Sequence, residues 1–209
     1  MTYRRSLNVV GLALTALMGI AYAGQSVPDK AEDVTPLQVG EAAPSFDAQN
    51  PQGGPYSFKA GELDAPVVMI FYRGGWCPYC NKHLKELKDA VPTLKENGVE
   101  VLFFSADKPE LLVDTLSETA PDYTLLSDAS MAISRAFGIA FKVDDNTIKR
   151  YKKFGIDLEK ASGFSHHQLP VPSVYVVKAD GKIGFDYNNP DYKVRLSPEE
   201  LLSAAGVAP

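Results

Sequence analysis

Side chains that can carry covalent or metal chemistry are scarce in this chain. Its 209 residues include two cysteines, three histidines and one tryptophan. The cysteines, Cys77 and Cys80, stand in a C-x-x-C spacing. A disulfide that closes so short a loop gains little chain entropy and is a poor structural staple. The pair is therefore better suited to a disulfide that opens and closes during a reaction.

Basic residues are fewer than acidic residues. The chain has 21 Lys and Arg residues against 26 Asp and Glu residues, which gives a formal net charge of −5. This balance argues against nucleic acid or an anionic lipid surface as a partner. The sequence has no internal repeat and no low-complexity segment, and its length suits one domain with a sizeable core.

No apolar run is long enough to span a membrane. The mostly apolar residues 7–20 fall short of the roughly 20 residues that a spanning helix needs. Arg4 and Arg5 precede this run, and Ala21-Tyr22-Ala23 follows it with the small-x-small pattern of a cleavage site. We therefore predict a signal peptide over residues 1–23 that is cut after Ala23.

The mature protein is then expected in the periplasm, where disulfides form and persist. No cysteine lies near the cleavage site to take a lipid, so no membrane attachment is predicted after cleavage. The loss of two arginines changes the net charge from −5 to −7. Residues 24–38 are polar and are predicted to be a flexible leader, and residues 39–209 are predicted to form one domain.

Hydrophobic patterns predict an α/β fold. Residues 66–72 and 99–105 are near-continuous apolar runs, which is typical of buried central strands. Apolar residues at helical spacing follow Cys77, with a kink at Pro92. Asp107 is predicted to cap the next helix. The other predicted elements are strands within 40–58 and at 123–126, 174–177 and 183–187, helices at 109–120, 130–137, 144–154 and from 198, and an irregular segment at 155–169.

This order of elements predicts one central mixed sheet with helices on both faces, extended by the N-terminal strands. The two cysteines then lie at the carboxyl end of a central strand, where open α/β sheets place their sites. They also lie at a helix N-terminus, where free N–H groups and the helix dipole stabilise a thiolate. The sequence therefore predicts a thiol–disulfide redox site.

From about Gly40 to its end, the chain resembles a thioredoxin-fold redoxin. The peroxiredoxin-like relatives of the alkyl hydroperoxide reductase and thiol-specific antioxidant family are the most similar. Three features carry the resemblance: the strand that leads into W-C-P-Y-C at 76–80, the segment V-P-S-V-Y at 171–175, and the hairpin V-Y-V-V-K-A-D-G-K-I at 174–183. The resemblance implies a thioredoxin-like fold, dithiol chemistry and a cis peptide bond before Pro172.

Two families assign the cysteines differently. In thioredoxin-like proteins the first cysteine of the motif attacks and the second resolves, which here means Cys77 and then Cys80. The peroxiredoxin pattern F-x-P-x-x-F-T-x-x-C instead places Cys80 at the peroxidatic position, with Cys77 at the threonine and Arg73 at the proline. The arginine that peroxiredoxins carry before a late strand is missing. Arg73 either replaces its charge or is a partly exposed residue at a strand end.

The favoured hypothesis is a periplasmic antioxidant redoxin. Cys80 would attack a hydroperoxide, Cys77 would condense with the resulting sulfenic acid, and an exported thiol would reduce the disulfide. The alternative is a thiol–disulfide oxidoreductase that acts on protein disulfides. Cys77 would then be the nucleophile, and Pro172 would present its backbone to the substrate.

A third hypothesis is a copper-binding chaperone with the same fold. Cys77 and Cys80 would combine with histidines His83, His166 and His167. Exported copper chaperones of this fold use C-x-x-x-C, however, and this chain has C-x-x-C. We therefore predict neither a metal nor a cofactor. Haem attachment is excluded because Asn81 stands where the motif needs histidine.

The histidines have simpler interpretations. His83 is interpreted as a solvated or capping residue on a lysine-rich helix. His166 and His167 either lie near the cysteines as tuners of their pKa or form a pair in a surface loop.

Neighbours of the cysteines are expected to support them. Trp76 should pack beside the two thiols and shield them, while Pro78 and Tyr79 tune the redox potential. Residues 141–168 exceed what a bare thioredoxin fold needs, and we expect them to cover the site or form an interface.

Overall fold

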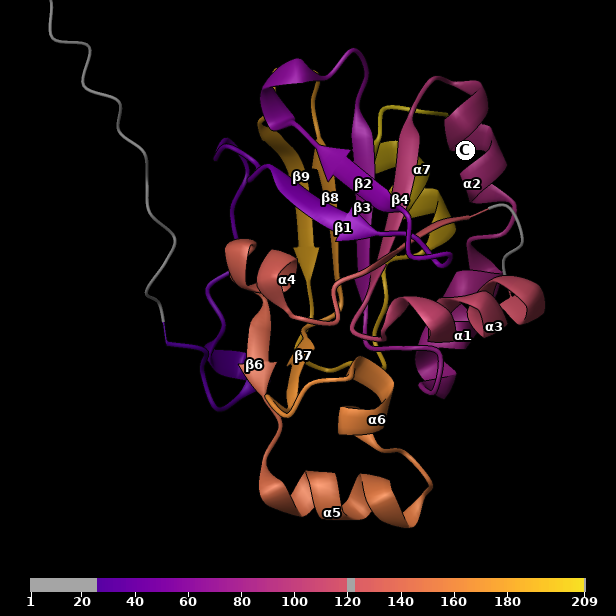
Figure 1. The fold of residues 1–209 in the computed structure, drawn as a ribbon. Helices are drawn as coiled ribbons and strands as arrows, with labels where there is room; N and C mark the ends of the chain where they lie inside the picture. Colours follow the sequence, from indigo (N-terminus) through magenta and orange to yellow (C-terminus); the bar gives the residue numbers. More distant parts are fainter. Residues whose placement is uncertain (1–25, 120–122, 209) are drawn as a thin grey trace, which may run out of the picture.

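A seven-stranded mixed sheet forms the centre of the molecule (Figure 1). The computed structural model describes residues 26–119 and 123–208, so the predicted signal peptide lies outside the described residues. The strand order is β2-β1-β5-β4-β3-β8-β9, and β6 and β7 form a separate small sheet. The strands are β1 (Phe46–Gln49), β2 (Pro55–Phe58), β3 (Val67–Tyr72), β4 (Glu100–Ser105), β5 (Thr124–Ser127), β6 (Ala140–Lys142), β7 (Gln168–Pro170), β8 (Ser173–Val177) and β9 (Ile183–Asn188).

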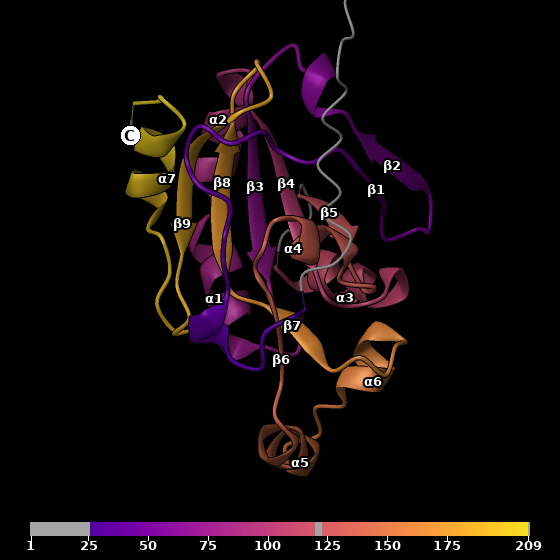
Figure 2. The same cartoon turned by 90° about the vertical axis from the view of Figure 1, so that its left-hand side faces the viewer.

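Helices cover both faces of this sheet, as the sequence predicts (Figure 2). The α1, α2 and α7 helices pack on one face, and α4 and the N-terminal segment pack on the other. The helices are η1 (Ala31–Asp33), η2 (Ala60–Glu62), α1 (Pro78–Glu86), α2 (Ala90–Glu96), α3 (Pro109–Thr119), α4 (Ala132–Ala136), α5 (Asp145–Lys153), α6 (Leu158–Ser162) and α7 (Pro198–Ala204).

The central strand β3 brings the cysteines to the middle of the sheet. It pairs in parallel with β4, with Phe71 opposite Phe104, and antiparallel with β8, with Phe71 opposite Ser173. All six residues of β3 are buried, because helices or loops cover both of its faces. The chain leaves the carboxyl end of β3 at Tyr72 and enters α1 six residues later. The site therefore lies at the carboxyl end of a central strand, as the sequence predicts.

The predicted kinked helix is two helices. The α1 helix ends at Glu86, and α2 begins at Ala90, two residues before Pro92. Proline has no N–H to donate, and its ring clashes with the carbonyl four residues earlier, so a continuous helix is lost in the turn before it.

Residues 155–169 are not irregular, contrary to the prediction. They contain α6 and β7, and β7 pairs with β6. The Asp157 side chain caps α6 by accepting hydrogen bonds from the backbone N–H groups of Glu159 and Lys160. Strands of three residues are too short to show the alternation that identifies a strand in a sequence. The α5 and α6 helices lie together beyond the carboxyl end of β3 (Figures 1 and 2).

Part of the predicted flexible leader is packed. The backbone N–H of Leu37 donates to the carbonyl of Phe137, and that of Lys142 donates to the carbonyl of Pro28. Leu37 is buried in the core on the α4 face of the sheet. The polar composition of this segment did not indicate these contacts.

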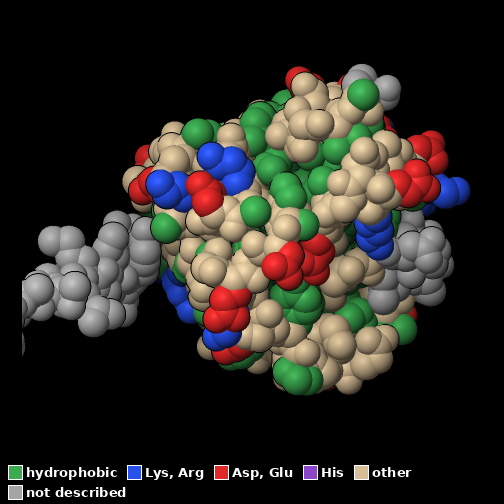
Figure 3. Space-filling view, turned by 90° about the horizontal axis from the view of Figure 1, so that it is seen from above, with side chains coloured by type: hydrophobic (Ala, Val, Ile, Leu, Met, Phe, Trp, Pro, Cys, Tyr) green, Lys and Arg blue, Asp and Glu red, His purple; other side chains and the backbone are tan. Residues whose placement is uncertain are grey.

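Surface charge is mixed on the end of the molecule opposite α5. Seen from this side, Lys and Arg side chains lie among Asp and Glu side chains and apolar groups (Figure 3). This end therefore carries no large patch of one sign. Within residues 26–119 and 123–208, no helix has the length and apolar character needed to cross a membrane.

We expect Gly138→Ala to destabilise the protein more than Gly155→Ala. Both glycines have positive φ angles, of 70° and 77°, so alanine is strained by about 1–2 kcal/mol at either position. A Cβ at Gly138 would also collide with the carbonyl of Thr35, whereas a Cβ at Gly155 meets nothing within 4 Å. Urea unfolding of both variants measures the difference, which should be roughly 1–3 kcal/mol. Equal losses would show that the segment around Thr35 is not held against the domain.

Candidate active site

The two cysteines occupy the first turn of α1. Cys77 is the N-cap residue, Pro78 follows in the first helical turn, and the backbone N–H of Cys80 donates to the carbonyl of Cys77 at 3.0 Å. Both sulfurs are free thiols, and the residues are 2% and 1% exposed. A substrate therefore reaches them only at a narrow opening or after a neighbouring side chain moves.

A buried carboxylate holds the turn that precedes the cysteines. Asp107 accepts a hydrogen bond from the backbone N–H of Gly75 at 2.7 Å and another from the indole N–H of Trp76 at 3.0 Å. Gly74 has a φ of 148°, and a Cβ there would collide with the Trp76 and Asp107 side chains. Burial raises the pKa of Asp107 to about 6. Asp107, which the sequence predicts as a helix cap, thus supports the turn that leads to the cysteines.

Protonation differs between the two cysteines. A hydrogen bond from the Cys80 thiol, assisted by the charges of Arg73 and Arg195, lowers the pKa of Cys77 to about 6. Burial raises the pKa of Cys80 well above that of an ordinary thiol. These opposite shifts favour Cys77 as the thiolate and Cys80 as its protonated partner.

Arg73 is buried, so the alternative of a partly exposed residue is wrong. It is 4% exposed and sits among three aromatic rings. Its guanidinium carbon lies 4.2 Å from the ring centroid of Tyr192, 5.3 Å from that of Trp76 and 5.5 Å from that of Tyr151. Its Nη2 donates to the Tyr151 hydroxyl. The aromatic rings fix the positive charge where it lowers the pKa of Cys77.

The segment predicted to cover the site does so. Tyr151 belongs to α5, and its ring packs against Trp76 at 5.9 Å between centroids. Ile156 and Leu158 continue this apolar cluster around Trp76. Residues 141–168 therefore close the Trp76 side of the cysteine pair.

Arg195 is a site residue that sequence reasoning missed. It lies between β9 and α7, and its Nη2 donates to the Cys80 sulfur at 3.4 Å. Its charge helps to lower the pKa of Cys77, and at Cys80 it opposes the larger rise that burial causes. The two residues are 115 positions apart, and no local pattern connects them. Only the fold brings this charge to the sulfur.

His83 is buried and not solvated as predicted. It is 4% exposed, and its Nε2–H donates to the carbonyl of Leu196 at 3.1 Å. Burial is the main reason that its pKa falls to about 4. The neutral ring therefore ties α1 to the segment that carries Arg195.

The remaining histidines have other partners. The Nδ1 of His166 accepts from the backbone N–H of Gln168, so its Nε2–H donates to the carbonyl of Ala129. Burial lowers the pKa of His166. His167 pairs with Glu159 at 2.7 Å.

The residues of the copper hypothesis do not gather around one point. In the part of the chain that the structure describes, no three His, Cys, Asp or Glu side chains are placed to hold a metal ion. His166 and His167 share a small pocket with Arg73 and Trp76, and the cysteines do not line it.

The peptide bond before Pro172 is trans, so the predicted cis bond is wrong. The trans form of an X-Pro bond is favoured by about 0.5–1 kcal/mol, and only local packing reverses it. Pro172 still lies beside the site, because it lines a pocket together with Arg73 and Tyr192. Tyr79 is 43% exposed and packs edge-on against Tyr192.

Comparison with known proteins identifies the family of this chain. The AhpC/TSA family matches residues 39–185, which is more than half of the chain. The chain belongs to the AhpC/TSA family. Membership makes this AhpC/TSA protein a thiol-dependent oxidoreductase, as the sequence predicts.

Two kinds of relative match this AhpC/TSA protein. It is 31% identical over 106 residues to peroxiredoxin Bcp of Escherichia coli, a match that covers 51% of this chain and 67% of that protein. It is 23% identical over 154 residues to the thiol-disulfide oxidoreductase ResA of Bacillus cereus, covering 72% of this chain and 70% of the relative. The first relative is named for the peroxide chemistry of the favoured hypothesis, and the second is named for the disulfide chemistry of the alternative.

Solved structures confirm the predicted thioredoxin-like fold. Peroxidoxin BcpB from Mycobacterium tuberculosis matches with a TM-score of 0.60 at 19% identity, covering 81% of this chain and 95% of that one. A peroxiredoxin-like protein from Aquifex aeolicus matches with a TM-score of 0.64 at 17% identity, covering 82% and 88%.

We expect the Cys77 thiol to be half ionised near pH 6, and Cys80→Ala to raise its pKa. The substitution removes the thiol that donates to Cys77, which is the largest cause of the lowered pKa. Cys80→Ser keeps a donor and should raise the pKa less. The ultraviolet absorbance of the thiolate, measured against pH, gives each value. An unchanged titration of Cys77 in Cys80→Ala would contradict this account.

We expect Arg195→Gln to slow reduction of the Cys77–Cys80 disulfide by dithiothreitol about tenfold. Cys80 leaves as a thiolate in this reaction, and a charge-assisted hydrogen bond of the kind Arg195 makes contributes about 1.5–3 kcal/mol. Arg195→Lys should recover part of the rate. Lys193→Gln removes an exposed charge from the same segment and serves as the control. Equal slowing by both glutamine variants would show a general charge effect only.

Proposed function

We propose that this protein is an exported thiol–disulfide oxidoreductase in which Cys77 attacks and Cys80 resolves. The observation that carries the proposal is the difference in acidity within the pair. The hydrogen bond from Cys80 and the charge of Arg73 lower the pKa of Cys77, which is the N-cap residue of α1, and burial raises the pKa of Cys80. The thiolate is the form of cysteine that attacks a disulfide, so the order of the two steps follows.

The first step forms a mixed disulfide. The Cys77 thiolate attacks one sulfur of the substrate disulfide, that S–S bond breaks, and the other substrate sulfur leaves as a thiolate. The charge of Arg73 stabilises the attacking thiolate before the step. A thiol with a pKa near the ambient pH is the best attacking group, because it combines ionisation with nucleophilicity.

The second step closes the internal disulfide. Cys80 gives its proton to the departing substrate thiolate and attacks the Cys77 sulfur, which releases the second half of the substrate. Two electrons pass from the dithiol to the substrate. Arg195 lies within hydrogen-bond distance of the Cys80 sulfur and stabilises its thiolate as it forms. Without this charge, a sulfur that is 1% exposed would ionise at a high cost.

Hydroperoxide reduction is the second candidate function. Membership of the AhpC/TSA family and the similarity to peroxiredoxin Bcp favour it. The Cys77 thiolate would attack the terminal oxygen of the hydroperoxide and become a sulfenic acid as the O–O bond breaks, and the departing alkoxide would take a proton from water and leave as an alcohol. Condensation with the Cys80 thiol would then release water and form the same disulfide. The acidity of Cys77 makes it the attacking residue here too, in place of the Cys80 that the peroxiredoxin pattern indicates.

The cellular setting is part of the proposal. We place the mature protein in the periplasm, after a cut that follows Ala23. An exported thiol donor would reduce the internal disulfide and complete the cycle.

We expect Cys80→Ser to trap a mixed disulfide when it meets a protein or peptide disulfide, because the resolving thiol is gone. Cys77→Ser should trap nothing, since the remaining thiol is buried and protonated. Mass spectrometry after acid quenching measures the adduct.

The same two variants, mixed rapidly with hydrogen peroxide, test the second candidate. Oxidation of Cys80→Ser to a sulfenic acid far faster than a free thiol would favour peroxide as the substrate. A trapped adduct in Cys77→Ser and none in Cys80→Ser would overturn the order of attack.

A further inference from the structure

Arg73 carries a buried positive charge without a carboxylate partner. It is 4% exposed, and no carboxylate of the described residues lies within ion-pair distance of it. Its hydrogen-bond partner, the Tyr151 hydroxyl, is neutral, and its Nε has no partner among the described residues. A buried charge without an opposite charge is costly, and aromatic rings and a neutral hydroxyl offset only part of that cost, so such a group is expected to meet an anion in some state of the protein.

The Cys77 thiolate is that anion in the reduced protein only. Arg73 lowers the pKa of Cys77, so the guanidinium and the thiolate stabilise each other in the dithiol form. Once Cys77 and Cys80 form a disulfide, both sulfurs are neutral. Among the described residues, no carboxylate then lies within ion-pair distance of Arg73.

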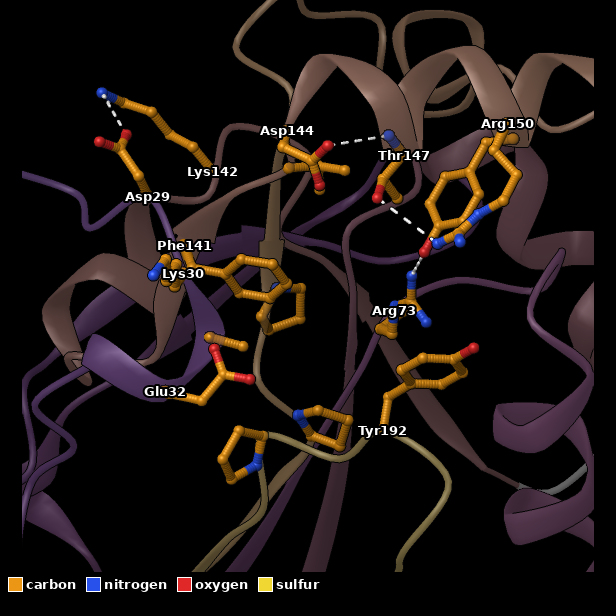
Figure 4. Close-up of a pocket in the computed structure, with 16 residues that line it drawn as sticks. Asp29, Lys30, Glu32, Arg73, Phe141, Lys142, Asp144, Thr147, Arg150 and Tyr192 are labelled. Carbon is orange, nitrogen blue, oxygen red and sulfur yellow. Dashed lines mark hydrogen bonds and ion pairs between the residues drawn. The ribbon is translucent and has the colours of Figure 1, made fainter.

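A pocket of about 290 Å³ opens on Arg73 (Figure 4). Figure 4 shows the guanidinium at the wall of this pocket, above the ring of Tyr192. Pro172 and Phe141 add apolar surface, and η1 closes the opposite side through Lys30 and Glu32. The lining thus combines apolar surface with charged side chains, which suits a small molecule that has an apolar body and one charged group.

The charges around the pocket favour an anion. Two of its carboxylates are already engaged: Asp29 pairs with Lys142 at 3.5 Å, and Asp144 caps α5. The lining residues without an ion pair among the described residues are three bases and one acid, namely Lys30, Arg73, Arg150 and Glu32. Arg73 is the buried member of this group and lies next to Tyr151, whose hydroxyl adds a second polar group.

We infer that this pocket binds the carboxylate of a small substrate, with the carboxylate on Arg73 and Tyr151 and the apolar part between Phe141 and Tyr192. This rests on the proposed function, because the substrate is then a small thiol or disulfide that carries a free carboxylate. The guanidinium serves both partners in turn: it stabilises the Cys77 thiolate before the reaction and holds the substrate carboxylate. A carboxylate-bearing hydroperoxide shares this chemistry and is the other source of such a ligand.

Binding is tested with a probe that undergoes no redox reaction. Phenylacetate and its neutral analogue phenylacetamide are titrated into the oxidised mature protein by calorimetry. We expect the acid to bind about tenfold more tightly than the amide, which is the usual effect of one charge-assisted hydrogen bond. Equal affinities for the two probes would overturn the assignment.

Variants identify the group that recognises the carboxylate. Arg73→Gln should abolish the preference for the acid, and Tyr151→Phe, which keeps the ring, should reduce it a few-fold. Arg135→Gln removes an exposed arginine outside this pocket and should change nothing. Circular dichroism verifies that each variant is folded. A preference that survives Arg73→Gln in a folded variant would overturn the assignment.

The redox state supplies a readout that a merely structural arginine would not give. Phenylacetate should bind several-fold more tightly to the disulfide form than to the dithiol form at neutral pH, because the Cys77 thiolate no longer competes for Arg73. By linkage, the bound probe should raise the pKa of Cys77 in the reduced protein. Equal binding to both forms would contradict the shared use of the charge.

Two reactive pairs then distinguish the sources of the ligand. The reduced protein is mixed with dithiodipropionate or its neutral diamide, and separately with a fatty-acid hydroperoxide or its methyl ester. Faster reaction of the acid in the disulfide pair supports the inference. A preference in the hydroperoxide pair alone leaves the pocket in place and overturns the proposed function. A preference in neither pair, with the trapped adduct of Cys80→Ser still observed, overturns the pocket and leaves the function.

Discussion

The unequal sharing of one proton between two neighbouring sulfurs is the interaction on which this site depends. The Cys80 thiol donates to Cys77, and burial keeps the donor's own pKa high. Both cysteines are almost fully buried, but Cys77 is the N-cap residue of α1 and feels the charge of Arg73, whereas burial dominates at Cys80. This difference gives the hydrogen bond its direction, and the proposed order of attack follows from that direction.

Two arginines that are far apart in the sequence act on this pair. Arg73 follows β3 and acts on Cys77, while Arg195 precedes α7 and contacts the Cys80 sulfur. The peroxiredoxin pattern that the sequence resembles has an arginine before a late strand, and this chain has none there. Positive charge reaches the two sulfurs from Arg73 and Arg195 instead.

Packing around the turn keeps these groups in place. Asp107 holds the backbone of Gly75 and the indole of Trp76, and His83 ties α1 to the segment of Arg195. The extension that carries α5 places Tyr151 against Trp76 and Arg73. Each of these contacts joins residues far apart in the chain. Tyr151 and Arg73 also line the pocket beside the dithiol.

The α/β fold, the order of most elements, the interruption of the helix near Pro92 and the place of Cys77 and Cys80 at a helix N-terminus follow from local signals, namely hydrophobic periodicity, the chemistry of proline and the C-x-x-C spacing. The strands of three residues and the packing of residues 28–37 were decided by the tertiary structure. So were the burial of Arg73 and His83, the trans bond before Pro172 and the contact of Arg195 with Cys80. Burial and charge at a point in space depend on segments that no short window contains, which is why the tertiary structure alone decided which sulfur is acidic.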